Sequence, residues 1–123
     1  MIVAVDFDGT IAENDNFPAV GSPVPGALKW LTRFNDEGID IILWTVRSAE
    51  ALKLAENYMA DAGIRLFGVN VNPDQSSFST SPKVFADAYI DDRAIGAPLI
   101  SFPSKPPFVD WGKAGPQVLN LKK

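Results

Sequence analysis

The sequence contains no cysteine and no histidine. Without cysteine there can be no disulfide bond, no zinc site built on thiolates and no cysteine nucleophile. Without histidine, Ser-His-Asp triads, phosphohistidine intermediates and most zinc chemistry are excluded as well. Any catalysis must therefore use carboxylates, hydroxyls, lysine, arginine and hard metal ions.

The chain also lacks the features that suit a membrane or a nucleic acid. No apolar run approaches the roughly 18 residues that cross a bilayer, and no basic segment precedes a long apolar one near the start. The formal net charge of −4 disfavours the phosphate backbone of a nucleic acid as the main partner. We therefore expect a cytoplasmic protein that acts on a small molecule. Its 123 residues suit one domain spanning residues 1–123.

Short apolar runs alternate with amphipathic stretches along most of the chain. The runs that predict strands cover residues 2–5, 39–44, 66–69 and 88–90. One helix is expected from Pro25 to Glu37, and a second, with Ser48 as its N-cap, up to Ala62; a glycine follows each of them. Alternation of this kind is typical of βαβ units. The sequence therefore predicts an α/β fold, a Rossmann-like three-layer sandwich with a mainly parallel central sheet.

The remaining segments have less regular patterns. Turn-forming residues predict loops over 14–24 and 70–82. The proline-rich stretch 98–107 is expected to wrap the surface, and residues 112–121 to form a last short helix or strand. The loops are too short to hold a second domain.

Charged and hydroxyl side chains follow three of the four predicted strands, and a lysine precedes the fourth. These residues are Asp6, Asp8, Thr45, Arg47, Lys83, Asp91 and Asp92. Ligands of open α/β sheets bind beyond the carboxyl ends of the strands, so we expect these side chains to converge on one rim. Several carboxylates gathered there would repel one another unless a cation lies among them. Mg²⁺ suits such a place because it prefers oxygen ligands.

The same residue types suggest phosphoryl transfer. An ionised carboxylate can attack phosphorus and form an aspartyl-phosphate. A second carboxyl can protonate the leaving oxygen and later deprotonate a water. A hydroxyl and an ammonium, here Thr45 and Lys83, would stabilise charge on the phosphoryl oxygens. Gly9 would let backbone N–H groups near Phe7 and Asp8 turn toward an anion.

Four motifs occur in a characteristic order: DFDGT at residues 6–10, LWT at 43–45, Lys83, and IDD at 90–92. They resemble the motifs of the haloacid dehalogenase (HAD) superfamily, and the resemblance covers about residues 1–96. The chain is most similar to the small members of that superfamily that lack a cap domain. The resemblance implies an HAD-like fold and a Mg²⁺-dependent phosphatase that cleaves a phosphate monoester. A sugar phosphate or a nucleotide is the substrate that we expect.

The resemblance also implies a role for each motif residue. Asp6 would be the nucleophile and a metal ligand, and Asp8 the general acid/base, with its backbone carbonyl on the metal. Asp91 would be a metal ligand, and Asp92 would either complete the metal site through water or orient Lys83. The residues expected to bind the phosphoryl group or the substrate are Phe7, Gly9, Thr10, Thr45, Arg47 and Lys83.

Several alternatives remain open from the residues alone. Arg47 and Arg93 can each meet a second anionic group of the substrate or pair with a rim carboxylate. Asn70 and Asn72 can line the pocket or simply form turns. Phe17 is the aromatic residue that a loop could place over a substrate.

Other functions also fit parts of the pattern. A phosphotransferase would pass the phosphoryl group to an alcohol, and a catalytically silent protein would only bind phosphate and Mg²⁺. A receiver-like signalling module is disfavoured, because the third predicted strand ends in Val69-Asn70 without an aspartate. Since no cap excludes solvent, we also expect the chain to form a homo-oligomer.

Overall fold

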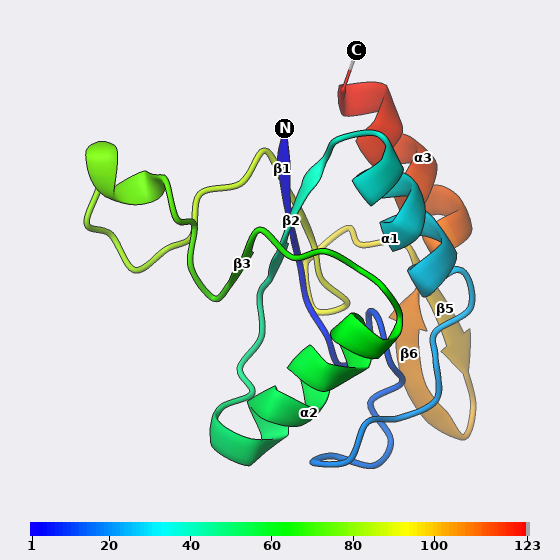
Figure 1. Cartoon of the computed structure of the whole chain (residues 1–123). Helices are drawn as coiled ribbons and strands as arrows, with labels where there is room; N and C mark the ends of the chain where they lie inside the picture. Colours follow the sequence, from blue (N-terminus) through cyan, green and yellow to red (C-terminus); the bar gives the residue numbers. More distant parts are fainter. Residues whose placement is uncertain (123) are drawn as a thin grey trace.

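A four-stranded parallel sheet with three helices forms the centre of the protein, as described for residues 1–122 by a computed structural model (Figure 1). The strands of this sheet are β1 (Ile2–Val5), β2 (Asp40–Leu43), β3 (Gly68–Val69) and β4 (Ala88–Ile90). The helices are α1 (Ala27–Asp36), α2 (Ala49–Asp61) and α3 (Trp111–Leu121). The α/β class and the parallel sheet are confirmed.

The strand order β3-β2-β1-β4 places the first strand between the second and the last. Val5 pairs with Leu43 on one side and with Ile90 on the other, so the carboxyl ends of β1, β2 and β4 lie at the same level. The chain moves outward from β1 through β2 to β3 and then returns to the other side of β1. Such a reversal of direction opens a crevice beyond the carboxyl ends of the two central strands. Here that crevice lies between β1 and β4.

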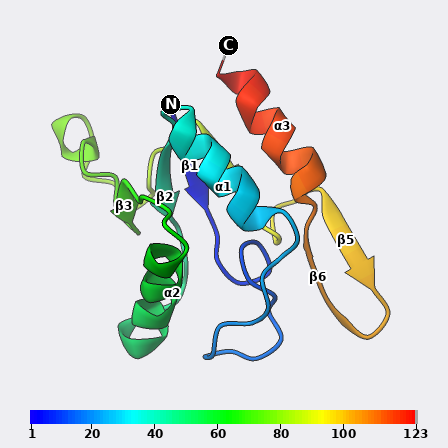
Figure 2. The ribbon, with the colours of Figure 1, turned by 45° about the vertical axis from the view of Figure 1, so that its right-hand side comes forward.

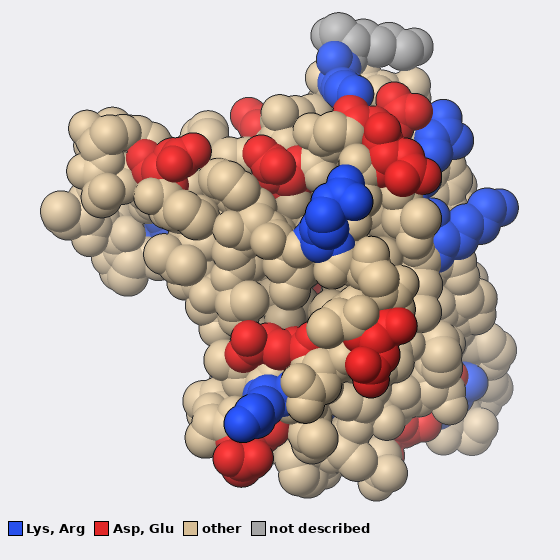
Figure 3. Space-filling model, in the orientation of Figure 1, with Lys and Arg blue, Asp and Glu red and all other residues tan. Residues whose placement is uncertain are grey.

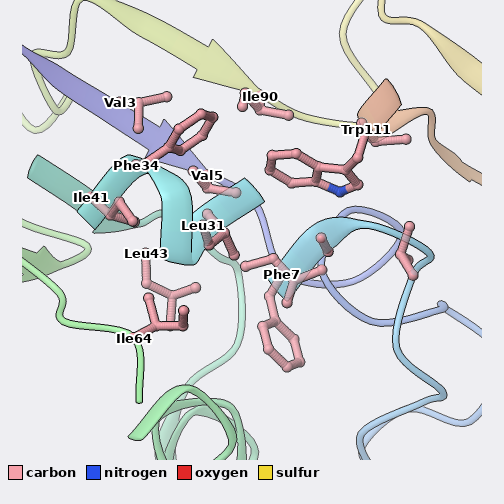
Figure 4. Packing of buried hydrophobic residues seen from close by; sticks show 14 of the residues in the cluster. Val3, Val5, Phe7, Leu31, Phe34, Ile41, Leu43, Ile64, Ile90 and Trp111 are labelled. Atoms are coloured by element: carbon pink, nitrogen blue, oxygen red, sulfur yellow. The ribbon is translucent and has the colours of Figure 1, made fainter. Parts of the chain in front are cut away.

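All three helices pack on one face of the sheet. Val3, Val5, Ile41 and Leu43 point to that face and form one buried cluster with residues from α1, α2 and α3 (Figures 2 and 4). Phe34 of α1 packs against Trp111 of α3, with ring centroids 6.2 Å apart. Burying this apolar surface supplies most of the driving force for folding.

The opposite face of the sheet is covered without a helix. Tyr89 pairs with Ala4 and points to this side, where its hydroxyl donates to the carbonyl of Val84. The buried side chains of Val84 and Ala86 lie in the irregular segment that leads into β4. The predicted three layers are therefore one layer of helices, the sheet, and a layer of irregular chain.

The helix boundaries differ slightly from those that the sequence predicts. Helix α1 begins at Ala27 rather than at Pro25, and α2 begins after Ser48. Ser48 occupies the N-cap position of α2 as expected, but its side chain makes no capping hydrogen bond. Gly38 and Gly63 follow the two helices as expected. No helix within residues 1–122 is both long and apolar enough to cross a bilayer.

The last quarter of the chain is more regular than the sequence predicts. The proline-rich stretch forms an antiparallel hairpin of β5 (Leu99–Phe102) and β6 (Lys105–Val109), and α3 follows it. Between β3 and β4, a short 3₁₀ helix (Gln75–Ser77) interrupts the predicted loop, which projects from the sheet as an arm (Figure 1). Charged residues of both signs are interspersed over the face in Figure 3.

Candidate functional site

Three carboxylates meet at the crevice between β1 and β4. Asp6 follows β1, and Asp91 and Asp92 follow β4. One carboxylate oxygen from each lies within 4.8 Å of the others. We refer to these three residues as the acidic trio. The strand register explains their meeting, because the N–H of Asp6 donates to the carbonyl of Ile90 at 2.9 Å and so continues the pairing of β1 with β4.

A pocket of about 470 Å³ opens above the acidic trio. The residues that line it are Asp6, Asp8, Asn14, Phe17, Val46, Asp91, Asp92 and Arg93. A smaller pocket of about 220 Å³ shares Asp6, Val46 and Asp91 with it and reaches Trp44 and Thr45. The structure thus brings together Asp6, Asp8, Thr45 and both acids of the IDD motif, as predicted.

Burial and repulsion raise the pKa values of two acids of the trio, Asp6 and Asp92. The pKa of Asp6 is raised from 3.8 to about 8, mainly by burial and then by the neighbouring acids Asp92 and Asp91, while a hydrogen bond from Thr10 opposes the shift. The pKa of Asp92 is raised as well, first by burial and then by Asp91. Ionising all three side chains is therefore unfavourable unless a positive charge joins them.

Gly9 and Thr10 hold the acidic trio together. Gly9 has φ +81°, and a Cβ on it would lie 2.2 Å from the Oδ2 of Asp92. Only glycine allows Asp92 to come so close to this turn. The buried Thr10 hydroxyl donates to Asp6 at 3.1 Å and accepts from the N–H of Asp92 at 3.2 Å. The predicted contact between Thr10 and substrate is therefore wrong for its side chain, which links the two acidic segments.

Phe7 is also buried rather than exposed to substrate. Its side chain is fully covered and packs edge-on against Tyr58 of α2, with ring centroids 5.7 Å apart. The prediction for Phe7 concerns its backbone N–H group, which the burial of the side chain does not test, so that contact stays a prediction. The alternation of side chains along an extended segment explains the burial, because Phe7 points away from the side to which Asp6 and Asp8 point.

Arg47 binds Asp8 and not a ligand. Its Nε and Nη2 donate to the two carboxylate oxygens of Asp8, both at 2.8 Å. Its Nη1 donates to the carbonyls of Pro18 and Ala51, and its Nη2 also donates to the carbonyl of Ala19. Arginine has five N–H hydrogens, and all are used here. Because Arg47 is also buried, the prediction that it binds substrate is wrong, and of the two alternatives the ion pair with a rim carboxylate is the one formed.

Thr45 is positioned by a residue that follows β3. The side-chain oxygen of Asn70 accepts from the N–H of Thr45 at 2.8 Å. Asn70 adopts φ 55°, a left-handed conformation that asparagine tolerates better than most residues. Thr45 in turn accepts from the N–H of Arg47 through its hydroxyl at 3.1 Å. The sequence left the role of Asn70 open, and the structure shows it supporting the end of β2.

Lys83 lies outside both pockets. Its ammonium is 5.9 Å from the ring centroid of Tyr89, and within residues 1–122 it forms no ion pair with a carboxylate. The prediction that Lys83 lies among the acids is therefore not met in this structure. Arg93 is the exposed cation that lines the larger pocket, and its charge lowers the pKa of Asp92 against the main shift.

The C-terminal segment secures the turn that carries the acids. The N–H of Val109, at the end of β6, donates to the carbonyl of Gly9 at 3.0 Å. The indole N–H of Trp111 donates to the carbonyl of Thr10 at 2.7 Å. Sequence reasoning missed both residues. A tryptophan that opens a helix gives no signal of such a contact, because its partner lies a hundred positions earlier in the chain.

With this geometry in place, one solved structure proves similar over the whole length. It is described as the structure of a conserved protein from Bacteroides thetaiotaomicron, and it matches with a TM-score of 0.78 and 33% sequence identity. The match covers 100% of this chain and 92% of that one. The chain belongs to the same family as this conserved Bacteroides protein. Its description names no activity. No family model and no curated protein matches the chain.

The chemistry of the donor set fits a hard divalent cation. Carboxylate oxygens are the ligands that such ions prefer, and the acidic trio offers three of them at one point. Within residues 1–122 none of the three forms an ion pair, and the raised pKa of Asp6 agrees with that. Asp8 does not belong to the trio, because its carboxylate is turned to Arg47. Its predicted contribution to a metal would therefore come from the backbone.

Proposed function

We propose that this protein is a Mg²⁺-dependent phosphohydrolase that cleaves a phosphate monoester through an aspartyl-phosphate on Asp6. The observation that carries the proposal is the acidic trio at the reversal point of the sheet, with a fourth carboxylate, Asp8, lining the same pocket. Two acids with different surroundings suit two different chemical roles. The order of the motifs, which resembles that of the HAD superfamily, supports the same assignment.

Mg²⁺ would be held by Asp6, Asp91 and Asp92, and when bound it would neutralise charge on the phosphoryl oxygens. The carboxylate of Asp6 would attack phosphorus while the bond to the leaving oxygen breaks. Thr45, in the adjoining pocket, would hold a phosphoryl oxygen, and Arg93 would add positive charge at the mouth of the larger pocket. Lys83 can serve the same purpose only if its side chain leaves the ring of Tyr89.

Asp8 would handle the proton. In the first step Asp8 would give the leaving oxygen a proton that it must first have taken up from solvent, because the carboxylate paired with Arg47 carries none; in the second step it would take a proton from the attacking water, which releases phosphate and restores Asp6. Arg47 grips both carboxylate oxygens of Asp8, so the side chain is held in one orientation beside the pocket. An oriented base needs no further ordering when the substrate arrives.

Asp6→Asn is the variant that tests the proposal. The wild-type protein should release phosphate from p-nitrophenyl phosphate when Mg²⁺ is present and not when it is chelated. Asp6→Asn should lose this activity by about a thousandfold or more, because the amide is a poor nucleophile. Asp61→Asn, which changes an exposed acid at the end of α2, is the matched control and should keep the activity. Undiminished turnover in Asp6→Asn would refute the mechanism.

The same assay separates the alternatives. A phosphotransferase would form a phosphorylated alcohol in place of free phosphate when glycerol is added, which product analysis would detect. A silent binding protein would bind Mg²⁺ without turnover of any ester. The expected self-association is tested separately by the mass of the protein in solution.

A further inference from the structure

We propose that Phe17 is a stacking surface for a planar aromatic group on the substrate, and that Arg47 fixes this surface in place. The inference that this substrate also carries a phosphoryl group rests on the proposed function above. The aromatic end rests on an independent feature, namely the apolar part of the lining of the same pocket. Phe17 lines the same pocket as the acidic trio, although it comes from the loop between β1 and α1.

Phe17 has one occupied face and one open face. The guanidinium carbon of Arg47 lies 4.9 Å from its ring centroid. The residue is nevertheless 58% exposed, which leaves a large apolar surface turned to the pocket and solvent. Exposure of apolar surface to water is unfavourable, so a ligand that covers the Phe17 ring gains binding free energy. The ring is thus available to a second flat group.

Arg47 makes the loop around Phe17 rigid. It donates to the carbonyls of Pro18 at 2.6 Å and Ala19 at 3.1 Å, which are the two residues directly after Phe17. On its other side the same guanidinium lies 5.1 Å from the ring centroid of the buried Phe7. Arg47 therefore sits between two aromatic rings and is bonded to the loop as well. A surface held in this way loses little conformational entropy on binding, which favours affinity.

The chemistry of the walls selects an aromatic group over a sugar. Val46, which is almost completely exposed, lines the pocket together with Phe17. Neither side chain can donate or accept a hydrogen bond, so neither can bind the hydroxyls of a sugar by hydrogen bonding. Flat rings stack on aromatic side chains without needing specific polar contacts. The polar part of the pocket is confined to the acids, Asn14 and Arg93. An aryl phosphate or a nucleotide matches this division better than a sugar phosphate.

Two phosphonates that cannot be hydrolysed test the proposal without turnover. Phenylphosphonate carries a ring and methylphosphonate does not, and binding of each to the wild-type protein with Mg²⁺ is measured by calorimetry. We expect phenylphosphonate to bind more tightly. Phe17→Ala should raise its Kd by about tenfold, within the range known for loss of one stacking partner, and Phe17→Tyr should restore it. Phe78→Ala removes an exposed phenylalanine of the arm and is the matched control.

Each outcome bears on one proposal. Equal affinity of the two phosphonates, or a Kd for phenylphosphonate that Phe17→Ala leaves unchanged, would overturn the stacking role even if the protein hydrolyses phosphate esters. Conversely, Phe17-dependent binding of phenylphosphonate with no Mg²⁺-dependent release of phosphate from any ester would support the stacking role and refute the phosphohydrolase. If phenylphosphonate fails to bind at all, the stacking proposal is wrong.

Discussion

The two acids of the DFDGT motif lie in opposite electrostatic surroundings, although one residue separates them. Asp8 has its own cation, because both of its oxygens accept from the buried Arg47. Within residues 1–122 Asp6 forms no ion pair, and its carboxylate lies close to those of Asp91 and Asp92. The protein neutralises one carboxylate internally and leaves the other three to repel one another.

This difference indicates that the charge of Asp8 is balanced within the protein, whereas the charge of Asp6 is balanced only when a cation binds. Breaking a buried ion pair from one side leaves an uncompensated charge and is costly. Leaving three acids unpaired is also costly, unless a cation regularly binds there. We therefore expect mutation of the Asp8–Arg47 ion pair to lower stability. We expect metal binding and pH to change stability through the acidic trio.

The largest effect on stability is expected from Arg47→Met. This change removes the only positive partner that the structure gives Asp8 within residues 1–122, along with hydrogen bonds to three carbonyls. The free energy of unfolding should fall by about 3–5 kcal/mol, measured by urea denaturation. Arg33→Met, which breaks an exposed ion pair with Glu37 on α1, should cost less than about 0.5 kcal/mol. Similar losses in both variants would contradict the contrast.

A double variant sharpens this prediction. Replacing both partners, as Asp8→Asn with Arg47→Met, should cost less than the sum of the two single changes, because no charge is then left unpaired. Strict additivity would mean that Arg47 acts on the loop at Pro18 and Ala19 and not through Asp8.

A smaller gain is expected from Mg²⁺ binding at the acidic trio. A ligand that binds only the folded protein adds about 2.7 kcal/mol at a concentration one hundred times its Kd. The melting temperature should therefore rise with Mg²⁺ concentration in the wild-type protein. In Asp91→Asn the rise should be much smaller, while in Asp61→Asn it should be unchanged, as thermal unfolding followed by circular dichroism would show. An equal rise in all three proteins would place the metal elsewhere.

The most gradual effect is expected from pH in the metal-free protein. Asp6 has a pKa of about 8 when folded and 3.8 when exposed, so between these values the folded chain keeps a proton that the unfolded chain has lost. This group's contribution to stability is complete below about pH 4 and is lost as pH rises through about 8. The free energy of unfolding should therefore fall between pH 5 and pH 8 in chelator.

The control for the pH effect is Asp6→Asn, which cannot titrate. Its unfolding free energy should depend less on pH over the same range, and saturating Mg²⁺ should reduce the slope of the wild-type protein in the same way. A wild-type slope equal to that of Asp6→Asn would show that the pKa of Asp6 is not raised.

The convergence of the acids was open to sequence reasoning because it depends on local rules. Asp6 and Asp91 each follow a short apolar run, and parallel strands align their carboxyl ends. The hairpin at 99–109 was not predicted, because β6 contains two prolines, which are rare inside strands. In addition, apolar and polar residues need not alternate regularly in a hairpin at the surface. Likewise, the partner of Trp111 could not be read from its neighbours.

Local patterns in the amino-acid sequence account for the alternation of strands and helices, the order of the motifs and the gathering of four acids at one rim. Only the tertiary structure decided how those charges are shared. It paired Arg47 with Asp8, left Lys83 beside Tyr89, and placed Phe17 in the lining of the pocket. The physical reason is distance along the chain: patterns of two or four residues fix local structure, whereas an ion pair between residues 39 positions apart exists only after the core has brought their segments together.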